Sequence, residues 1–187
     1  EEVVEDVWSA AALGLRQLGP TDVTRAATSL QTLMVDDPSP VLWKQVASAL
    51  DALGVQPAAG TLAELAYLVA KGQWEEVAAL SPSMDAFPLL ATILGETEHN
   101  PQARITAAIH LGKLSAQAER YDTLVSILST LADGRQDPDE AVRAACTAAL
   151  ITIGTAALPR TILYEAVVRR EARAIDYLRL ITGVSQD

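Results

Sequence analysis

Few side chains in this 187-residue chain could do chemistry. Its only histidines, His99 and His110, lie 11 residues apart, and neither has a carboxylate or cysteine partner at the spacing of a metal site. The single cysteine, Cys146, falls at an apolar position of an alanine-rich helical pattern, with no histidine or helix N-terminus nearby to lower its pKa. We expect a buried, inert thiol and no catalytic or metal-binding role for either histidine.

The remaining candidates for catalysis are paired carboxylates, at Glu75-Glu76 and Asp139-Glu140. Adjacent residues on a helix point in different directions, so we expect these groups to be helix caps or solvated. The sequence contains no glycine-rich phosphate loop, nucleophile elbow or zincin motif. We therefore predict that the chain is not an enzyme and uses no cofactor and no metal.

Charge is unevenly distributed along the chain. The formal net charge is −10, and residues 1–98 hold 14 acidic and four basic side chains, whereas residues 99–187 hold ten of each. An acidic half repels phosphate backbones, which disfavours a nucleic-acid partner.

The chain has no run of about 18 apolar residues that would suggest a membrane span, and a single cysteine is typical of a reducing compartment. We expect a cytoplasmic chain without a membrane partner. Because a helical pattern starts almost at Glu1, we also expect an excised domain or a processed form.

A basic cluster near the C-terminal end is the one charged feature that could mark a binding site. It consists of Arg160, Arg169, Arg170, Arg173 and Arg179. One interpretation is a solvated helix face whose arginines pair with Glu165, Glu171 and Asp176. The other is a docking patch for an acidic partner, with Arg160, Arg169, Arg170 and Arg173 as the partner-binding residues.

The elements that hold these residues are predicted to be helices, arranged as a repeat. Four apolar positions follow Arg104 at offsets of +3, +4, +7 and +10, and the same offsets follow Arg143, 39 residues later. The two sets are Ala107, Ala108, Leu111 and Leu114, and Cys146, Thr147, Leu150 and Ile153. Such offsets lie on one face of a helix, and a period near 40 is typical of stacked helical pairs. Looser copies begin at Trp8, Trp43 and Glu171.

Turn and cap residues divide the chain into these helices. The predicted ranges are 3–18, 22–34, 40–53, 61–71, 73–80, 84–97, 101–115, 118–132, 138–154, 159–169 and 171–181. We expect Thr21, Ser39, Asn100 and Asp137 to cap helix N-termini, and Thr61 with Glu64 to form a capping box. Residues 72–99 fit the period worst and indicate a degenerate repeat or an insertion.

The best-formed copy resembles a HEAT repeat of the short, armadillo-like bacterial kind named after phycobiliprotein lyases. The resemblance is carried by Asp137-Pro138, Val142-Arg143 and Ala148-Ala149-Leu150, with Asp133 at the end of the preceding hairpin. Asn100-Pro101 through Gly112 matches a second time. The resemblance implies that the repeat arginine bonds to the turn between repeats, forming a ladder along the stack.

Tryptophan replaces this arginine in two N-terminal copies, at Trp8 and Trp43. Apolar packing would then replace the polar ladder, and the alternative is an exposed binding ridge. Trp74 lies in the irregular stretch and could serve either purpose.

Together these patterns predict an all-α fold, a right-handed α-α superhelix of about five helical pairs plus a closing helix, forming a single domain over residues 1–187. The predicted function is a scaffold that binds a protein or peptide on its concave face, built from the second helix of each pair. Self-association into a homodimer through terminal repeats is a variant. Two alternatives stay open: a chromophore-lyase-like subunit, implied by the resemblance alone, and a structural spacer of a larger protein.

Overall fold

A computed structural model describes residues 10–11, 13–14, 17, 19–118 and 121–155 of the chain. Within these ranges the regular elements are helical, and no strand occurs. Contacts divide the chain into two compact units, residues 1–81 and 82–187. The all-α prediction is confirmed for the described residues. The prediction of a single domain stays a prediction.

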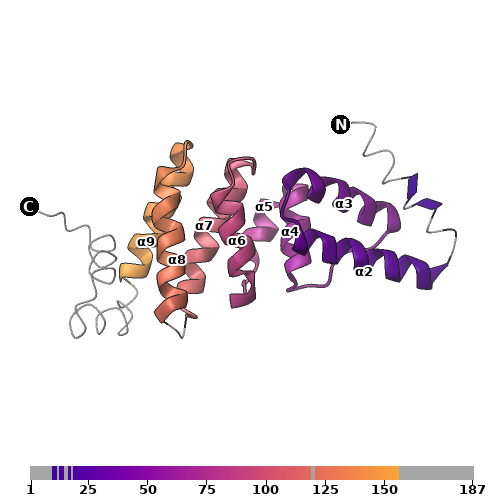
Figure 1. Ribbon diagram of the computed structural model, residues 1–187, viewed down its shortest axis with the longest axis horizontal. Coiled ribbons are helices and arrows are strands. Elements are labelled where there is room, and N and C mark those ends of the chain that lie inside the picture. Colours follow the sequence, from indigo (N-terminus) through magenta and orange to yellow (C-terminus); the bar gives the residue numbers. More distant parts are fainter. Residues whose placement is uncertain (1–9, 12, 15–16, 18, 119–120, 156–187) are drawn as a thin grey trace, which may run out of the picture. The chain divides into compact units, whose positions relative to one another are not determined.

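The first unit contains four helices, which appear in indigo to magenta in Figure 1. They are α2 (Pro20–Asp36), α3 (Pro40–Leu53), α4 (Leu62–Lys71) and the short α5 (Trp74–Ala79). Helices α2, α3 and α4 pack against one another, and α5 packs against α4. The expected first helix, 3–18, lies largely outside the described residues, and so does Trp8.

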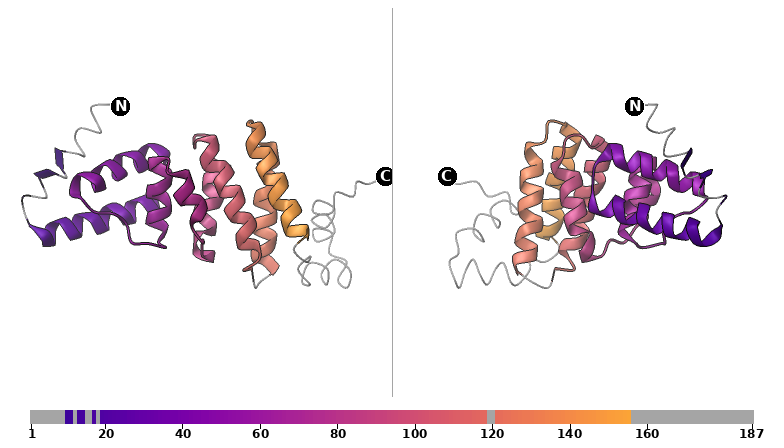
Figure 2. Two further views of the ribbon diagram at one scale, coloured as in Figure 1. Left: turned by 180° about the vertical axis from the view of Figure 1, so that it is seen from behind. Right: turned by 45° about the vertical axis from the view of Figure 1, so that its right-hand side comes forward.

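The second unit contains the two best-matching copies of the sequence pattern, those that follow Arg104 and Arg143. Its elements are the 3₁₀ turn η1 (Met84–Ala86), α6 (Phe87–Gly95), α7 (Pro101–Ser115), α8 (Tyr121–Asp133), the 3₁₀ turn η2 (Gly134–Gln136) and α9 (Glu140–Thr155). Helices α6 and α8 form one layer and α7 and α9 the other, as the front and back views show (Figures 1 and 2). The predicted helices 159–169 and 171–181 lie outside the described residues.

The predicted repeat faces form the cores of both units. All four positions after Trp43 and all four after Arg104 are buried, and so are three of the four after Arg143. The fourth, Thr147, is half-buried and donates its hydroxyl to the Arg143 carbonyl. Leu124, Ile127, Leu128 and Leu131 of α8 are buried as the sequence predicts. Burial of these apolar side chains is the main stabilising term of each unit.

Most predicted helix starts and ends are confirmed, because local chemistry decides them. Pro40 and Pro101 occupy first helical turns, where their missing N–H groups cost nothing. The Thr61 side chain accepts a hydrogen bond from the Glu64 amide, and the Glu64 carboxylate returns one to the Gly60 amide. Gly54 closes α3 in the left-handed region, with φ of 71°.

Two predicted caps are wrong. Helix α2 begins at Pro20 with Gly19 as its N-cap, so Thr21 lies inside the first turn. Proline has the φ that a first helical residue needs, and Gly19 adopts φ of 124°, which other residues avoid. At α9 the cap is Asp139, whose carboxylate accepts the Ala141 and Val142 amides. Asp137 makes a different set of bonds, described below.

Trp43 is a packing residue, which excludes the alternative of an exposed ridge at this position. Its side chain is 1% exposed, and its indole Nε1 donates to the Met34 carbonyl at 2.8 Å. That carbonyl lies near the end of α2, and the residue four places on, Pro38, has no N–H to donate. The indole therefore satisfies a buried helix carbonyl that the backbone cannot. Trp74 is half-buried, and neither of its two interpretations is decided.

We expect Trp43→Phe to lower the free energy of unfolding of the first unit by about 1–3 kcal/mol, because it removes this buried hydrogen bond and leaves the Met34 carbonyl without its donor. Urea unfolding followed by the fluorescence of the other tryptophans measures the loss, since all three precede residue 82. Gln45→Ala, at a half-buried position of the same helix, is the control. A loss no larger than that of the control would contradict the assigned role of the indole.

Candidate functional site

The four arginines predicted to bind a partner, Arg160, Arg169, Arg170 and Arg173, lie outside the described residues. The docking-patch prediction and its alternative, a solvated face, therefore both stay predictions. A candidate site among the described residues has to come from other groups.

The two histidines and the cysteine are enclosed in the core, whereas Glu75, Glu76 and Glu140 are exposed. His99 and His110 are 2% and 0% exposed, and Cys146 is 0% exposed. Burial, followed by the nearby charge of Asp137, raises the pKa of the Cys146 thiol to about 11. The thiol therefore stays protonated and unreactive at neutral pH. In the described part of the chain, no three His, Cys, Asp or Glu side chains are grouped as a metal site would require.

A buried ion pair links the two repeats of the second unit. Arg104 on α7 donates from Nε to Asp137 Oδ2 at 2.9 Å and from Nη2 to Oδ1 at 3.0 Å. Both side chains are 4% exposed. The remaining nitrogen, Nη1, donates to the carbonyls of Thr97, at 3.1 Å, and of His99. One guanidinium thus joins the turn before α7 to the turn before α9.

Asp137 is the centre of this second turn. Besides the two bonds from Arg104, its carboxylate accepts the Asp139 amide at 2.8 Å. Arg143 of α9 donates to the Asp137 carbonyl at 2.8 Å and to the Pro138 carbonyl at 2.9 Å. Arg104 and Arg143 therefore both bond to this turn. The turn from η2 to α9 is held from both sides and cannot shift without breaking buried bonds.

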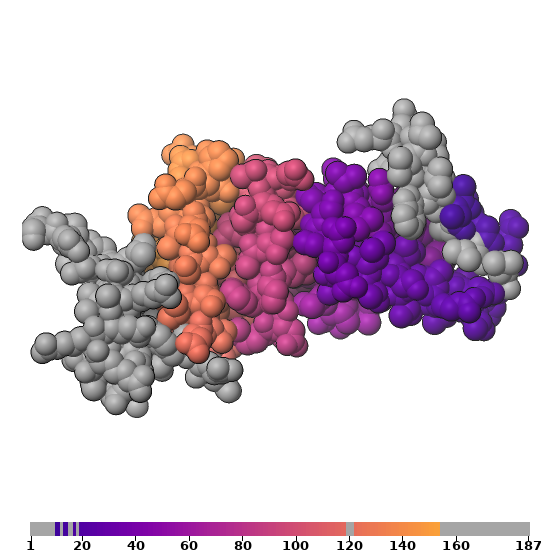
Figure 3. All heavy atoms as spheres, in the orientation of Figure 1, coloured from indigo at the N-terminus to yellow at the C-terminus, as the bar shows by residue number. Residues whose placement is uncertain are grey.

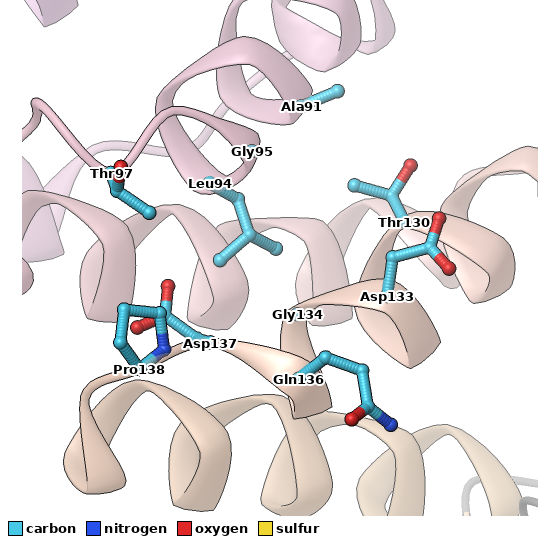
Figure 4. Close-up of a pocket in the computed structure, with 10 residues that line it drawn as sticks. All are labelled: Ala91, Leu94, Gly95, Thr97, Thr130, Asp133, Gly134, Gln136, Asp137 and Pro138. Carbon is cyan, nitrogen blue, oxygen red and sulfur yellow. The ribbon is translucent and has the colours of Figure 1, made fainter.

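A groove lies beside this turn on the second unit. It has a volume of about 390 Å³, at the lower end of the range of about 300–1,000 Å³ typical of ligand pockets. Helix α6 contributes Ala91, Leu94 and Gly95, helix α8 contributes Thr130 and Asp133, and the turns contribute Thr97, Gly134, Gln136, Asp137 and Pro138. In Figure 4 the Leu94 side chain extends from α6 toward Gly134 and Asp137, and Asp133 and Thr130 lie on the α8 side.

The groove combines an apolar floor with an electronegative rim. Leu94 is 3% exposed at its base, whereas Asp133 is exposed at its edge. Helix α6 ends at Gly95, and α8 continues from Asp133 into the 3₁₀ turn η2, which ends at Gln136, so two helical C-terminal ends meet at the groove. Each helix C-terminus carries a partial negative charge from its last carbonyls, which adds to the charge of the Asp133 carboxylate. The groove therefore favours a cation or a hydrogen-bond donor.

A shallower hollow of about 800 Å³ lies at the opposite ends of the same helices. It is lined by Met84, Asp85, Phe87, Pro88, Gln117, Ala118 and Thr123. Positions 119 and 120, which adjoin this wall, fall outside the described residues. The groove at α6 and α8 is the better-defined of the two surfaces.

The first unit carries a polar cluster that is structural. Asp51 of α3 accepts hydrogen bonds from Tyr67 and Lys71 of α4. Partial burial acts to raise the pKa of Asp51, but the bonds from Lys71 and Tyr67 and the charge of Lys71 outweigh it and lower the pKa below the ordinary 3.8. Partial burial, then the bond to Asp51 and its charge, raises the pKa of Tyr67 to about 12. The cluster connects α3 to α4.

This cluster predicts that the free energy of unfolding of the first unit depends on pH. Because the folded-state pKa of Asp51 is depressed, its contribution to stability is present above about pH 3.8 and is lost as the pH falls through the folded-state pKa. Tyr67 contributes fully below pH 10, and its contribution is lost as the pH rises toward 12. We expect Asp51→Asn to lower the pKa of Tyr67, measured by NMR titration of its ring. Asp36→Asn, on α2 of the same unit, should leave that pKa unchanged, and equal effects of the two variants would contradict the assignment.

Sequence reasoning did not identify the groove, although it singled out some of its residues. In the predicted repeat pattern, Asp133 ends one hairpin and Asp137-Pro138 begins the next. The contribution of α6 was hidden, because its residues belong to the stretch that fits the period worst. Among the described residues, no helix has the combination of length and apolar character needed to cross a membrane.

The chain was also compared with known protein families, with curated proteins and with solved structures, and none of the three comparisons found a match.

Proposed function

We propose that the chain is a binding scaffold without catalytic activity, and that its groove at the ends of α6 and α8 holds an extended peptide of a protein partner. The proposal includes the finer fold prediction, a right-handed, HEAT-like superhelix of about five helical pairs plus a closing helix. In such a stack the second helices of successive pairs line one continuous surface.

The observation that carries the proposal is the composition of the groove. It is bordered by α6 and α8, which lie in one layer of the second unit. In the proposed superhelix these two would be the second helices of successive pairs. Figure 3 shows the residues of these helices side by side on one face of that unit. An apolar floor with a few polar groups at the rim is the usual arrangement of a peptide- or ligand-binding site.

The rigidity of the groove supports the same proposal. Its wall at Asp137 and Pro138 is held by buried bonds from Arg104 and by more exposed bonds from Arg143, so little conformational freedom is lost when a ligand binds. The reactive groups nearby argue against catalysis, since the Cys146 thiol is buried and its pKa is raised to about 11. The acidic chain favours a protein partner over nucleic acid.

A direct test is selection of peptides from a random twelve-residue display library with the purified chain. Gly95→Leu should abolish binding of the selected peptides, because a side chain added at Gly95 meets no atom within 4 Å and would extend into open space at the groove. Ala141→Leu adds the same side chain at an exposed position of α9 outside the groove, and it should leave binding intact. Selected peptides that bind Gly95→Leu as tightly as the original chain would overturn the proposal.

A further inference from the structure

The groove has the chemistry of a subsite for one kind of side chain. Three of its lining residues carry oxygen acceptors, namely Asp133, Thr97 and Gln136, and Asp133 and Thr97 lie on opposite sides of Leu94 (Figure 4). All three residues are exposed, and within the described ranges no basic side chain lies within ion-pair distance of Asp133. The Thr130 hydroxyl, by contrast, is already donated to the Ser126 carbonyl at 2.9 Å. The opening is therefore rich in acceptors and contains one full negative charge.

The helix ends add to this preference. Both α6 and α8 direct their C-terminal ends to the groove, through Gly95 and Asp133. Partial negative charge at two helix C-termini attracts cations and repels carboxylates and phosphates. The nearest buried cation, Arg104, directs four of its N–H donors to Asp137 and to the carbonyls of Thr97 and His99, away from a ligand in the groove. The carboxylate and the helix ends at the groove favour a cationic ligand over an anionic one.

The floor restricts the cation further. Ala91, Leu94 and Pro138 present carbon atoms below the acceptors. A compact, strongly hydrated ion would lose its water shell there without replacement, whereas a long side chain with an apolar stem and a charged head can contact both levels. A guanidinium is weakly hydrated, is planar, and can donate to several acceptors at once, including two bonds to one carboxylate.

We infer that the groove is a recognition site for an arginine side chain of the partner, with the stem on Leu94 and Pro138 and the guanidinium bonded to Asp133. This inference rests on the proposed function and specifies it: the bound segment is an arginine-containing peptide. An acidic or purely apolar segment would not fit this arrangement.

The test uses a defined probe, N-acetyl-arginine N-methylamide, and the complete chain labelled with ¹⁵N. We expect saturable shifts of the backbone amide signals of Gly95, Thr97, Gly134 and Gln136. The citrulline derivative has nearly the same shape but no charge, and it should bind at least about tenfold more weakly, which corresponds to roughly 1.4 kcal/mol. Binding of the arginine probe should weaken as salt is added, because the rim is exposed.

Two variants separate a specific site from general attraction to an acidic protein. Asp133→Asn should weaken arginine binding about tenfold, whereas Asp85→Asn, which removes the same charge from an exposed position of the second unit outside the groove, should change it less than about twofold. Equal binding of the citrulline probe, or equal effects of the two variants, would overturn the inference.

The outcome for the arginine site is distinguishable from the outcome for the scaffold function. Library peptides that require an open groove but show no need for arginine would overturn the arginine site and leave the scaffold proposal standing. The arginine probe could instead bind in a way that depends on Asp133, while no selected peptide loses affinity for Gly95→Leu. That result would support the arginine site and overturn the proposal that a peptide binds along the groove.

Discussion

Replacing Arg104 with methionine should lower the free energy of unfolding of the second unit by about 3–5 kcal/mol, because it leaves the buried carboxylate of Asp137 without its partner. Methionine keeps much of the volume, so the loss reflects the charge and its hydrogen bonds. The carbonyls of Thr97 and His99 also lose a donor. Amide hydrogen exchange in α7 and α9 measures the effect, since fluorescence reports only the tryptophans of the first unit.

Two further variants identify the origin of this loss. Arg104→Lys should recover only part of the stability, since an ammonium cannot make two parallel bonds to Asp137 while also reaching the preceding turn. Arg104→Met combined with Asp137→Asn should be more stable than Arg104→Met alone, because the amide is neutral and can still accept the Asp139 N–H. A loss below about 1 kcal/mol for Arg104→Met would show that this pair does not hold the two turns together.

Gly134→Ala should cost about 1–3 kcal/mol through overpacking. A Cβ at this position would lie 2.6 Å from Cys146 Sγ and 3.3 Å from Leu94 Cδ2, and both side chains are buried. The backbone at Gly134 does not have a positive φ, so the cost is one of space and not of strain. We expect α8 and α9 to unfold at a lower urea concentration than in the original chain, and amide hydrogen exchange in these two helices measures the change.

Repeating Gly134→Ala in a Cys146→Ala variant tests whether the contact with Cys146 causes the loss of stability. Removing Sγ opens the space that the new methyl group needs, so Gly134→Ala should cost less in that background, with a coupling energy of about 0.5–3 kcal/mol. Gly95→Ala is the matched control: it adds the same methyl group to the wall of the same groove but meets no atom within 4 Å, and it should be neutral or slightly stabilising. Identical costs of Gly134→Ala in both backgrounds would contradict the packing explanation.

These two predictions show why the turn 134–138 matters for the proposed site. The turn carries Gln136 and Pro138 into the groove, and it is held by Arg104 from one side and packed against Cys146 and Leu94 at Gly134. A variant that loosens this turn should weaken peptide binding without touching the rim residue Asp133. Stability and recognition are therefore coupled through the same few side chains.

Much of the local structure could be predicted from the sequence. The positions buried after Trp43, Arg104 and Arg143 follow from one spacing rule, because residues at +3, +4, +7 and +10 share a helix face wherever a helix forms. The starts at Pro40 and Pro101 and the capping box at Thr61 are also local, since their hydrogen bonds connect residues at most four positions apart. The two wrong caps have different causes: α2 begins at Pro20, so Thr21 lies inside its first turn, and at α9 the Asp139 carboxylate accepts the amides that Asp137 was expected to cap.

The tertiary structure alone decided how these helices make a surface. Asp137 was expected to cap a helix, but its carboxylate instead binds Arg104, 33 residues earlier, a bond that no local pattern reveals. The groove requires Gly95 and Asp133, which are 38 positions apart, to meet at the ends of two helices. Local spacing determined which faces of the helices are apolar, because those faces repeat at fixed intervals. Which helix ends come together depends on how the buried faces pack, and the candidate binding site exists only where they do.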